Sequence, residues 1–242
     1  MSDRFAPVPR GLGFPPLIMG TLRRRYKRFL ADVALEDGSV VTAHCPNSGR
    51  MTGCSEPGRR VYLSRDARPG RKLAYTWQMI VMENGLVGVN TQVPNILVRR
   101  AVLSGCVPEL SGFAEAESEV RVGEKSRLDL RFSGPGAAPV LVEVKNCTLV
   151  EDGKALFPDA VTARGARHLA ELTALSRRGL PCAVFFLVQR MDAESFGPAD
   201  RVDPDFGRAL RKAARAGVAV IAYDCLLDPT SVRLRNKLPV NL

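Results

Sequence analysis

The stretch RLDLRFSGPGAAPVLVEVKN, residues 127–146, decides the fold of the second half of this 242-residue chain. Apolar and polar side chains alternate over RLDLRF (127–132) and again over VLVEVKN (140–146). A period of two is typical of a β-strand with one buried face, because successive side chains of a strand point to opposite faces. The stretch therefore predicts two strands of a sheet, separated by a turn that contains Gly and Pro.

Each of the two predicted strands carries charge on one face. Asp129 shares a face of the first strand with Arg127, and Glu143 shares a face of the second with Lys145. If the strands are neighbours, Asp129, Glu143 and Lys145 meet at one place. Carboxylate oxygens are the ligands that Mg²⁺ prefers, and a lysine beside the cation can orient a water or stabilise charge on a phosphate. The alternative interpretation is an ordinary cross-strand ion pair.

Around this pair of strands, residues 91–242 alternate between helical and strand patterns. A helix is predicted from Pro94 to Gly105, and another over 160–178, where Asp159 is placed to cap the helix and Gly179 to end it. The remaining elements are the strands SEVRVG (118–123), CAVFFLVQR (182–190) and VAVIAYD (218–224) and a helix over Phe206–Ala216. This order predicts an α/β sandwich over 91–242.

The helix predicted over 160–178 has a polar stripe beside its apolar one. Arg164, His168 and Glu171 form this stripe at positions i, i+4 and i+7. They could hold a phosphate near the metal, with Arg164 as the strongest donor. A solvated helix face is the alternative, since any amphipathic helix has a polar side.

The first half of the chain, residues 17–90, is typical of a small β-barrel. Its strand-like runs begin with KRFLADVAL (27–35) and SVVTAH (39–44), and Asp37-Gly38 between them is a hairpin signal. Short strands without helical periodicity favour an OB-like barrel, although an SH3-like barrel would leave a similar trace. Residues 1–16 are rich in Pro and Gly and are predicted to form an irregular arm.

The charge of the chain is strongly positive and unevenly distributed. The 35 Lys and Arg residues exceed the 25 Asp and Glu residues by 10, and residues 1–90 hold 14 of the basic and 7 of the acidic ones. Most of the excess therefore lies in the predicted barrel. Because no basic amphipathic helix or lipid anchor accompanies it, the charge indicates nucleic acid rather than a membrane as the partner.

The cysteines and the N-terminus indicate a reducing compartment. The six cysteines are scattered without CxxC spacing, and no apolar run has the length of a signal peptide core or of a membrane span. We therefore expect a cytoplasmic protein with free thiols. His44, Cys45 and Cys54 would make a partial zinc site, but a fourth ligand is missing, so small buried thiols are the preferred interpretation.

Two basic clusters in the predicted barrel are candidates for contact with nucleic acid. In both clusters cations stand beside aromatic rings, so phosphates can be neutralised while bases stack. For the first cluster, a basic strand edge that resists aggregation is the alternative. The candidates are Arg24, Arg25, Tyr26, Lys27 and Arg28 in RRRYKRF (23–29), and Arg71 and Lys72 in RKLAYTW (71–77).

Several longer strings of the sequence resemble one known family. They are RYKRFLADV (25–33), HCPNSGRM (44–51), RKLAYTW (71–77), EKSRLDL (124–130), EVKNCTL (143–149), ALFPDAVTARGARHL (155–169) and GPAD (197–200). This set resembles the sugar fermentation stimulation (SfsA) family over most of the chain. The resemblance implies an OB-like domain followed by a PD-(D/E)XK nuclease-like domain, non-specific DNA binding, and a regulatory connection to sugar catabolism, particularly of maltose, in bacteria.

The nuclease resemblance also assigns expected roles to residues of the second half. The acid on one strand followed by Glu-x-Lys on the next implies Asp129, Glu143 and Lys145 as catalytic residues. Many nucleases of this class add a glutamate from the first helix, and NILVRRAVLSG (95–105) contains none, so Glu119 is the expected substitute. The expected metal ligands are Asp129, Glu143 and Val144, and Arg127, Arg164 and His168 are expected to contact DNA.

Three functions remain open at this point. The first is a non-specific DNA-binding regulator of sugar catabolism, and the second is a DNA nuclease that depends on Mg²⁺ or Mn²⁺. The third is an RNA-binding OB protein, because OB surfaces accept either polymer. No recognition helix is present to read a DNA sequence. A homodimer is compatible with each of the three functions.

Overall fold

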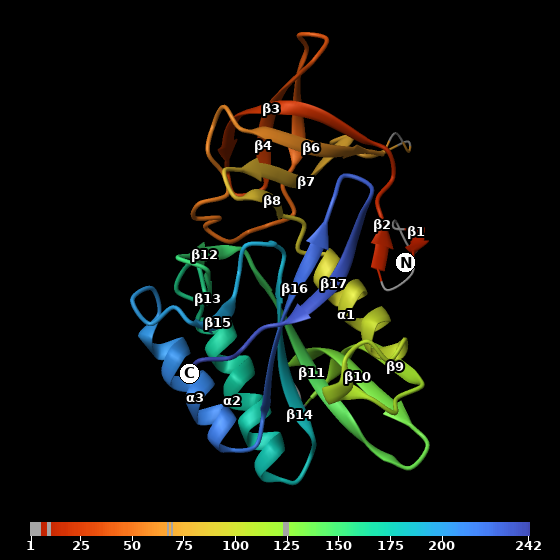
Figure 1. Ribbon diagram of the computed structural model, residues 1–242, viewed down its shortest axis with the longest axis vertical. Helices are drawn as coiled ribbons and strands as arrows, with labels where there is room; N and C mark the ends of the chain where they lie inside the picture. The colour runs from red at the N-terminus through yellow and green to blue at the C-terminus, as the bar shows by residue number, and fades with distance from the viewer. Residues whose placement is uncertain (1–5, 9–10, 67, 69, 123–125) are drawn as a thin grey trace.

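The computed structural model describes residues 6–8, 11–66, 68, 70–122 and 126–242 of the chain. A β-barrel from the first half lies against an α/β domain from the second half (Figure 1). The first residues of the expected string EKSRLDL, Glu124 and Lys125, lie outside the described residues. None of the helices in the described part of the chain is long and apolar enough to cross a bilayer.

The barrel is a sheet that closes on itself, as an OB-like domain requires. Its strand order is β5-β4-β3-β6-β7-β8, and β5 also pairs with β7, which closes the barrel. Its interior holds buried side chains such as Leu22, Val33 and Trp77. The strands are β3 (Leu17–Tyr26), β4 (Leu30–Leu35), β5 (Val40–His44), β6 (Arg60–Arg65), β7 (Tyr75–Met82) and β8 (Gly85–Gly88).

The hairpin predicted at Asp37-Gly38 is confirmed, but the start of the barrel differs from the expectation. Gly38 has a φ of +84°, which only glycine adopts without strain. The expected strand at 27–35 begins at Leu30 instead, because Lys27 and Arg28 have positive φ and form a tight turn. The first long strand, β3, therefore lies ahead of this turn and carries most of the basic segment.

The α/β domain is built on an eight-stranded mixed sheet with the order β1-β2-β17-β16-β14-β11-β10-β9. The three central strands β11, β14 and β16 are parallel, and the others pair antiparallel. Its strands are β1 (Ala6–Val8), β2 (Gly11–Gly13), β9 (Glu115–Arg121), β10 (Arg127–Gly134), β11 (Ala137–Cys147), β14 (Cys182–Val188), β16 (Ala219–Leu227) and β17 (Ser231–Lys237).

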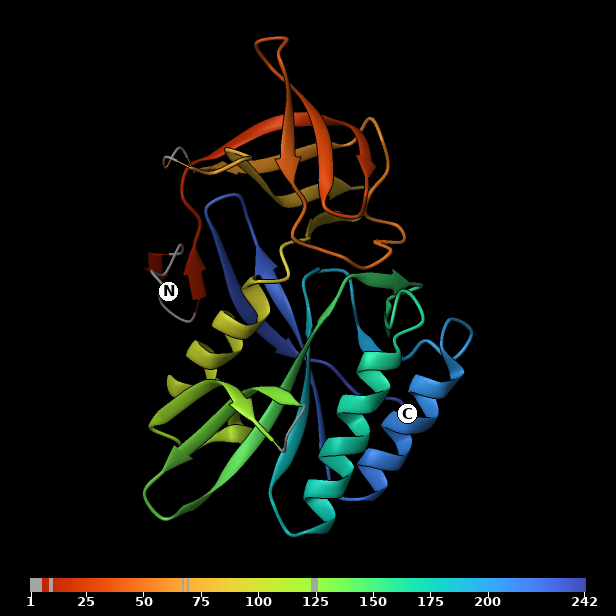
Figure 2. The same ribbon diagram turned by 180° about the vertical axis from the view of Figure 1, so that it is seen from behind.

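Helices cover both faces of this sheet (Figures 1 and 2). On β14, Val184 and Phe186 pack in the core with α2 and α3, whereas Phe185 packs in the other core with α1. Both faces are buried, which is why this strand is apolar throughout. The covering elements are α1 (Val93–Leu103), α2 (Ala163–Arg177), α3 (Pro204–Arg215), a 3₁₀ turn (Pro108–Leu110) and a small sheet of β12 (Leu149–Glu151), β13 (Lys154–Phe157) and β15 (Ser195–Pro198).

Two expectations for the ends of elements are wrong. Residues 11–13 of the expected irregular arm form β2, which pairs with β17 and so extends the sheet of the α/β domain. The backbone there is extended and Leu12 is fully buried, so tertiary pairing overrides the local Gly and Pro content. The cap of α2 is Thr162, whose hydroxyl accepts from the Gly165 N–H, and not Asp159.

Candidate nucleic-acid and metal site

The charged faces of β10 and β11 lie together, as the alternation predicted. The backbone N–H of Val144 donates to Asp129 Oδ2 at 2.8 Å, which fixes the β10 carboxylate beside Glu143. Lys145 Nζ donates to Glu143 Oε1 at 2.6 Å. Leu130 pairs with Val142, and that register brings the acid of β10 next to the Glu-x-Lys of β11. The structure therefore joins Asp129, Glu143 and Lys145 in one cluster.

Helix α2 adds two side chains to this cluster. His168 Nδ1 hydrogen-bonds Glu143 Oε1, and Arg164 Nε donates to His168 Nε2 at 3.4 Å. Because Nε2 accepts, Nδ1 is the nitrogen that carries the proton toward the carboxylate. The third residue of the predicted stripe, Glu171, accepts from the Oγ of Ser126, the residue directly before β10. The stripe thus ties α2 to β10 and β11 and is more than a solvated face.

The two carboxylates of the cluster differ in their electrostatics. Burial and the neighbouring charge of Glu143 raise the pKa of Asp129 above its ordinary value. Burial also acts to raise the pKa of Glu143, but the hydrogen bond from His168 and the positive charge of Lys145 bring it below the ordinary value. Glu143 is therefore the carboxylate that its surroundings hold ionised.

One buried atom of the cluster fits a cation. Glu143 is only 2% exposed, and in the described part of the chain its Oε2 is buried without a hydrogen-bond partner. A buried ionised oxygen left without a donor is costly, and a bound cation would satisfy it. Asp129 is the neighbouring carboxylate that could supply a second oxygen, whereas Val144, being apolar, could contribute only its main-chain carbonyl.

The remaining acid expected at the site has a different environment. Glu119 lies across from Asp129 in the register of β9 with β10, but its side chain is exposed and its φ is +57°. Helix α1 supplies an amide in place of an acid, since Asn95 Nδ2 donates to Asp129 Oδ1 at 3.1 Å. Among the described residues no group of three acidic, His or Cys side chains is arranged to hold a metal. The sequence offers one signal for Asn95, a polar side chain in the first turn of an apolar helix.

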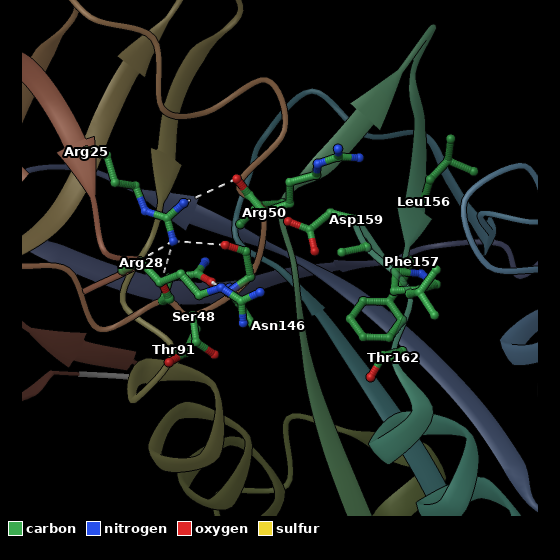
Figure 3. A pocket seen from close by; sticks show the side chains of 16 residues that line it. Arg25, Arg28, Ser48, Arg50, Thr91, Asn146, Leu156, Phe157, Asp159 and Thr162 are labelled. Carbon is green, nitrogen blue, oxygen red and sulfur yellow. Dashed lines mark hydrogen bonds between the residues drawn. The ribbon is translucent and has the colours of Figure 1, made fainter. Parts of the chain in front are cut away.

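The residues of the first basic cluster have different environments. Arg24 Nε pairs with Asp32 at 2.8 Å, and its guanidinium lies 4.7 Å from the centre of the Tyr26 ring. Arg25 donates to the backbone carbonyls of Arg28, Asn47, Gly49 and Arg50, so its guanidinium holds a loop (Figure 3). The side chains of Lys27 and Arg28 are exposed at the turn after β3, as is the ring of Phe29, at 50%.

Among the other Arg and Lys residues expected to contact DNA, Arg71 is held within its own loop and the others are exposed. Arg71 donates to Asp66, to Thr76 Oγ1 and to the Leu73 carbonyl, so it stabilises its own loop. Lys72 and Arg127 are exposed, and their charges are available to a polyanion. Arg164 is also exposed, although it contacts His168.

Some contacts between the barrel and the α/β domain come from polar residues that the sequence did not assign to an interface. Asp159 Oδ2 accepts from the Met51 N–H at 2.7 Å, and Thr91 Oγ1 donates to the Pro46 carbonyl at 2.6 Å. Gln189 Nε2 donates to Asn146 Oδ1 and to the Asn90 carbonyl. Between the two domains lies a cavity of about 550 Å³, which Figure 3 shows from close by.

Comparisons with known proteins agree with both halves of this architecture. A family model described as the SfsA N-terminal OB domain matches residues 24–89, and one described as the sugar fermentation stimulation protein RE domain matches residues 92–231. The sugar fermentation stimulation protein homologue of Pelobacter propionicus is 55% identical over 228 residues, which cover 94% of this chain and 99% of that protein. The homologue of Geobacter sulfurreducens is 53% identical over 225 residues, which cover 93% of this chain and 96% of that protein.

A solved structure is similar over the whole chain. The structure of Pyrococcus furiosus SfsA in complex with Ca²⁺ superposes with a TM-score of 0.89 at 27% sequence identity. The alignment covers 97% of this chain and 100% of the other. That protein was therefore solved with a divalent cation bound.

Proposed function

Because the chain belongs to the sugar fermentation stimulation protein family, we propose that it is a non-specific DNA-binding protein that holds a divalent cation between Asp129 and Glu143. The buried, unpartnered Oε2 of Glu143 is the observation that carries this proposal. The similar Pyrococcus furiosus protein, which was solved in complex with Ca²⁺, supports a divalent cation.

The exposed cations of the barrel support DNA as the partner. Residues 1–90 carry twice as many basic as acidic residues, and Lys27, Arg28 and Lys72 are exposed there. Exposed cations bind the phosphate backbone without reading sequence, and the entropy of released counterions contributes much of the affinity. The ring of Phe29, which is half exposed beside Arg28, offers a surface on which a base can stack.

The cluster has the groups that phosphodiester cleavage needs. A divalent cation at this place would offset the charge of a phosphate and lower the pKa of a bound water. His168 and Lys145 both hold Glu143 Oε1, which leaves Oε2 as the free ligand. The ammonium of Lys145 has three N–H donors and gives one to Glu143, so the others can donate to a phosphate oxygen.

Incubation with DNA tests both parts of the proposal. Supercoiled, linear and single-stranded DNA are incubated with Mg²⁺, Mn²⁺ or EDTA, and binding is measured separately in Ca²⁺. If the cluster cleaves DNA, Lys145→Ala abolishes cutting and leaves binding within about twofold. Absence of binding to every DNA, at salt concentrations down to about 50 mM, would contradict the proposal.

Binding without cutting is a second candidate function, and a specific observation favours it. Helix α1 presents Asn95 to Asp129 where a further acid would strengthen the cation site. A protein with such a site could act on sugar metabolism, the process named in its relatives' description, by occupying DNA alone. Tight binding with no cutting in either metal would select this candidate.

An RNA-binding role is distinguished by the same assay. The exposed cations and Phe29 would serve RNA equally well, because phosphates and base faces are common to both polymers. Binding to single-stranded RNA about tenfold tighter than to any DNA would replace DNA by RNA as the partner.

A further inference from the structure

The cavity of about 550 Å³ between the two domains has walls from both of them (Figure 3). The barrel contributes Arg28 and the loop 47–50, and the α/β domain contributes Asn146 and the segment 156–162. Its volume lies within the range of sites for small ligands, roughly 300–1,000 Å³. The cavity exists only while the domains are docked, and the hydrogen bond from Met51 to Asp159 docks them beside it.

The lining of the cavity favours an anion. The side chains of Arg28 and Arg50 are exposed, and in the described part of the chain neither guanidinium has a hydrogen-bond or ion-pair partner. Among the described lining residues the single carboxylate is Asp159, which already accepts the Met51 N–H. Thr162, the N-cap of α2, also lines the cavity, so the positive end of that helix dipole lies there.

The barrel wall of the cavity is held in a strained shape. Lys27, Arg28 and Met51 have φ values of 48°, 64° and 57°, in the left-handed region that disfavours side chains other than glycine. The guanidinium of Arg25 joins the turn at Arg28 to the loop 47–50 through their carbonyls. Such strain persists where the surrounding structure imposes it, and it gathers at ligand sites. The backbone positions of Arg28 and Arg50 are therefore fixed relative to each other.

The cavity lies at the end of β11, next along the chain to the carboxylate–lysine cluster. Asn146, which lines the cavity, follows Lys145 directly on β11. Thr91, on another wall, lies one turn before Asn95, the donor to Asp129. An anion in the cavity would thus lie along the same strand end as the candidate cation site.

We propose that this cavity takes a short unpaired stretch of single-stranded DNA, with its phosphates on Arg28 and Arg50. Its volume of about 550 Å³ suits one or two unpaired nucleotides. Proteins that act on nucleotides inside such pockets use single-stranded or flipped-out substrate. The inference rests on the proposed function and adds a preference for single strands over duplex.

Two kinds of variant should prevent single-stranded DNA from binding in the cavity while leaving the carboxylate–lysine cluster intact. The double variant Arg28→Ala/Arg50→Ala removes its cations, and Ser48→Trp, at an exposed lining position, fills it. The matched control is Arg177→Ala/Arg178→Ala, which removes the same charge at the far end of α2. Binding to a labelled oligothymidylate of about 12 nucleotides and to a duplex of equal length is measured in Ca²⁺.

The binding measurements distinguish a failure of this inference from a failure of the proposed function. We expect the unaltered protein to bind the oligothymidylate about tenfold or more tightly than the duplex. Ser48→Trp should lose about tenfold on the single strand and at most about twofold on the duplex. Arg28→Ala/Arg50→Ala also removes a cation that is open to any DNA, so it should weaken binding to both DNAs but lose more on the single strand. The control should lose at most about twofold on either. Equal affinities for both DNAs, or cavity variants that behave like the control, would overturn this inference and leave the proposed function standing. Failure of the unaltered protein to bind either DNA would refute the proposed function itself.

Discussion

At the scale of single residues, similar side chains do different work because their partners differ. Arg24 and Arg25 are neighbours on β3, yet Arg24 is exposed over Tyr26 whereas Arg25 donates to four backbone carbonyls. Glu143 is buried between a lysine and a histidine, whereas Glu119 is exposed. Burial and hydrogen-bond partners, rather than residue type, separate a structural charge from one that is free for a ligand.

The unpartnered oxygen of Glu143 leads to a prediction about cation binding. We expect Ca²⁺ to raise the melting temperature of the protein, since a ligand at a hundred times its Kd stabilises the fold by about 2.7 kcal/mol. Glu143→Gln should abolish this rise because the amide offers no charge to the cation. The control is Glu117→Gln, an exposed acid on β9 that should leave the rise unchanged. An undiminished Ca²⁺ response of Glu143→Gln in a thermal unfolding assay would place the cation elsewhere.

The two arginines of β3 should differ in their contribution to stability. Arg25→Ala leaves carbonyls of the loop 47–50 without donors, so we expect a loss of about 1.5–3 kcal/mol in the free energy of unfolding. Arg24→Ala breaks an ion pair whose arginine is 68% exposed, and should cost clearly less than the loss of Arg25. Urea unfolding of both variants measures the difference, and equal losses would contradict the structural role given to Arg25.

At the scale of elements, the ends of helices and strands position the charged residues of the candidate site. The parallel strand β11 brings Glu143 and Lys145 toward the end of the sheet at which the barrel docks. Helix α2 begins at the interdomain cavity and reaches Glu143 through His168. The tight turn between β3 and β4 exposes Lys27 and Arg28.

The cap of α2 should matter for both stability and the site. Thr162→Ala removes the acceptor of the Gly165 N–H and should lower the free energy of unfolding by about 1 kcal/mol. Because the first turns of α2 carry His168, Ca²⁺ affinity should fall as well. Thr162→Ser keeps the hydroxyl and should behave like the unaltered protein in urea unfolding and in calorimetric Ca²⁺ titration. If alanine and serine have the same effect, the methyl group of Thr162 matters and its cap does not.

At the scale of the whole molecule, the docking of two domains creates features that neither has alone. The cavity and the hydrogen bonds from Met51 to Asp159 and from Thr91 to Pro46 all require the barrel and the α/β domain together. The two domains approach each other closely at Gly88 of β8. A Cβ atom on Gly88 would lie 2.5 Å from Gln189 Oε1, so a larger residue at this position of β8 would force the Gln189 side chain to move.

The salt dependence of DNA binding follows from the charge of the whole surface. The logarithm of the binding constant should fall linearly with the logarithm of salt concentration, by about 0.9 per neutralised phosphate of a duplex. Lys27→Ala should reduce the slope by about one phosphate. Arg177→Ala, at the far end of α2, should leave it unchanged. Fluorescence anisotropy over a range of salt gives the slopes, and affinity that does not vary with salt would exclude phosphate contacts as the basis of binding.

The sequence by itself determined which segments have the period of a strand and where the hairpin of the barrel turns. The alternation in residues 127–132 and 140–146 predicted the strands that bring Asp129 beside Glu143, and Asp37-Gly38 predicted the hairpin of the barrel. These predictions succeed because a strand's period and a glycine turn are set by residues close together in the chain.

Only the tertiary structure decided which partner each side chain has. Local sequence indicated an irregular arm where β2 pairs with β17, and a helix cap where Asp159 instead receives the Met51 N–H. It placed Arg25 among the residues expected to contact DNA, whereas in the structure its guanidinium donates to the carbonyls of a loop. Each outcome depends on groups far away in the chain, which meet only when the domains pack and buried polar groups must find partners.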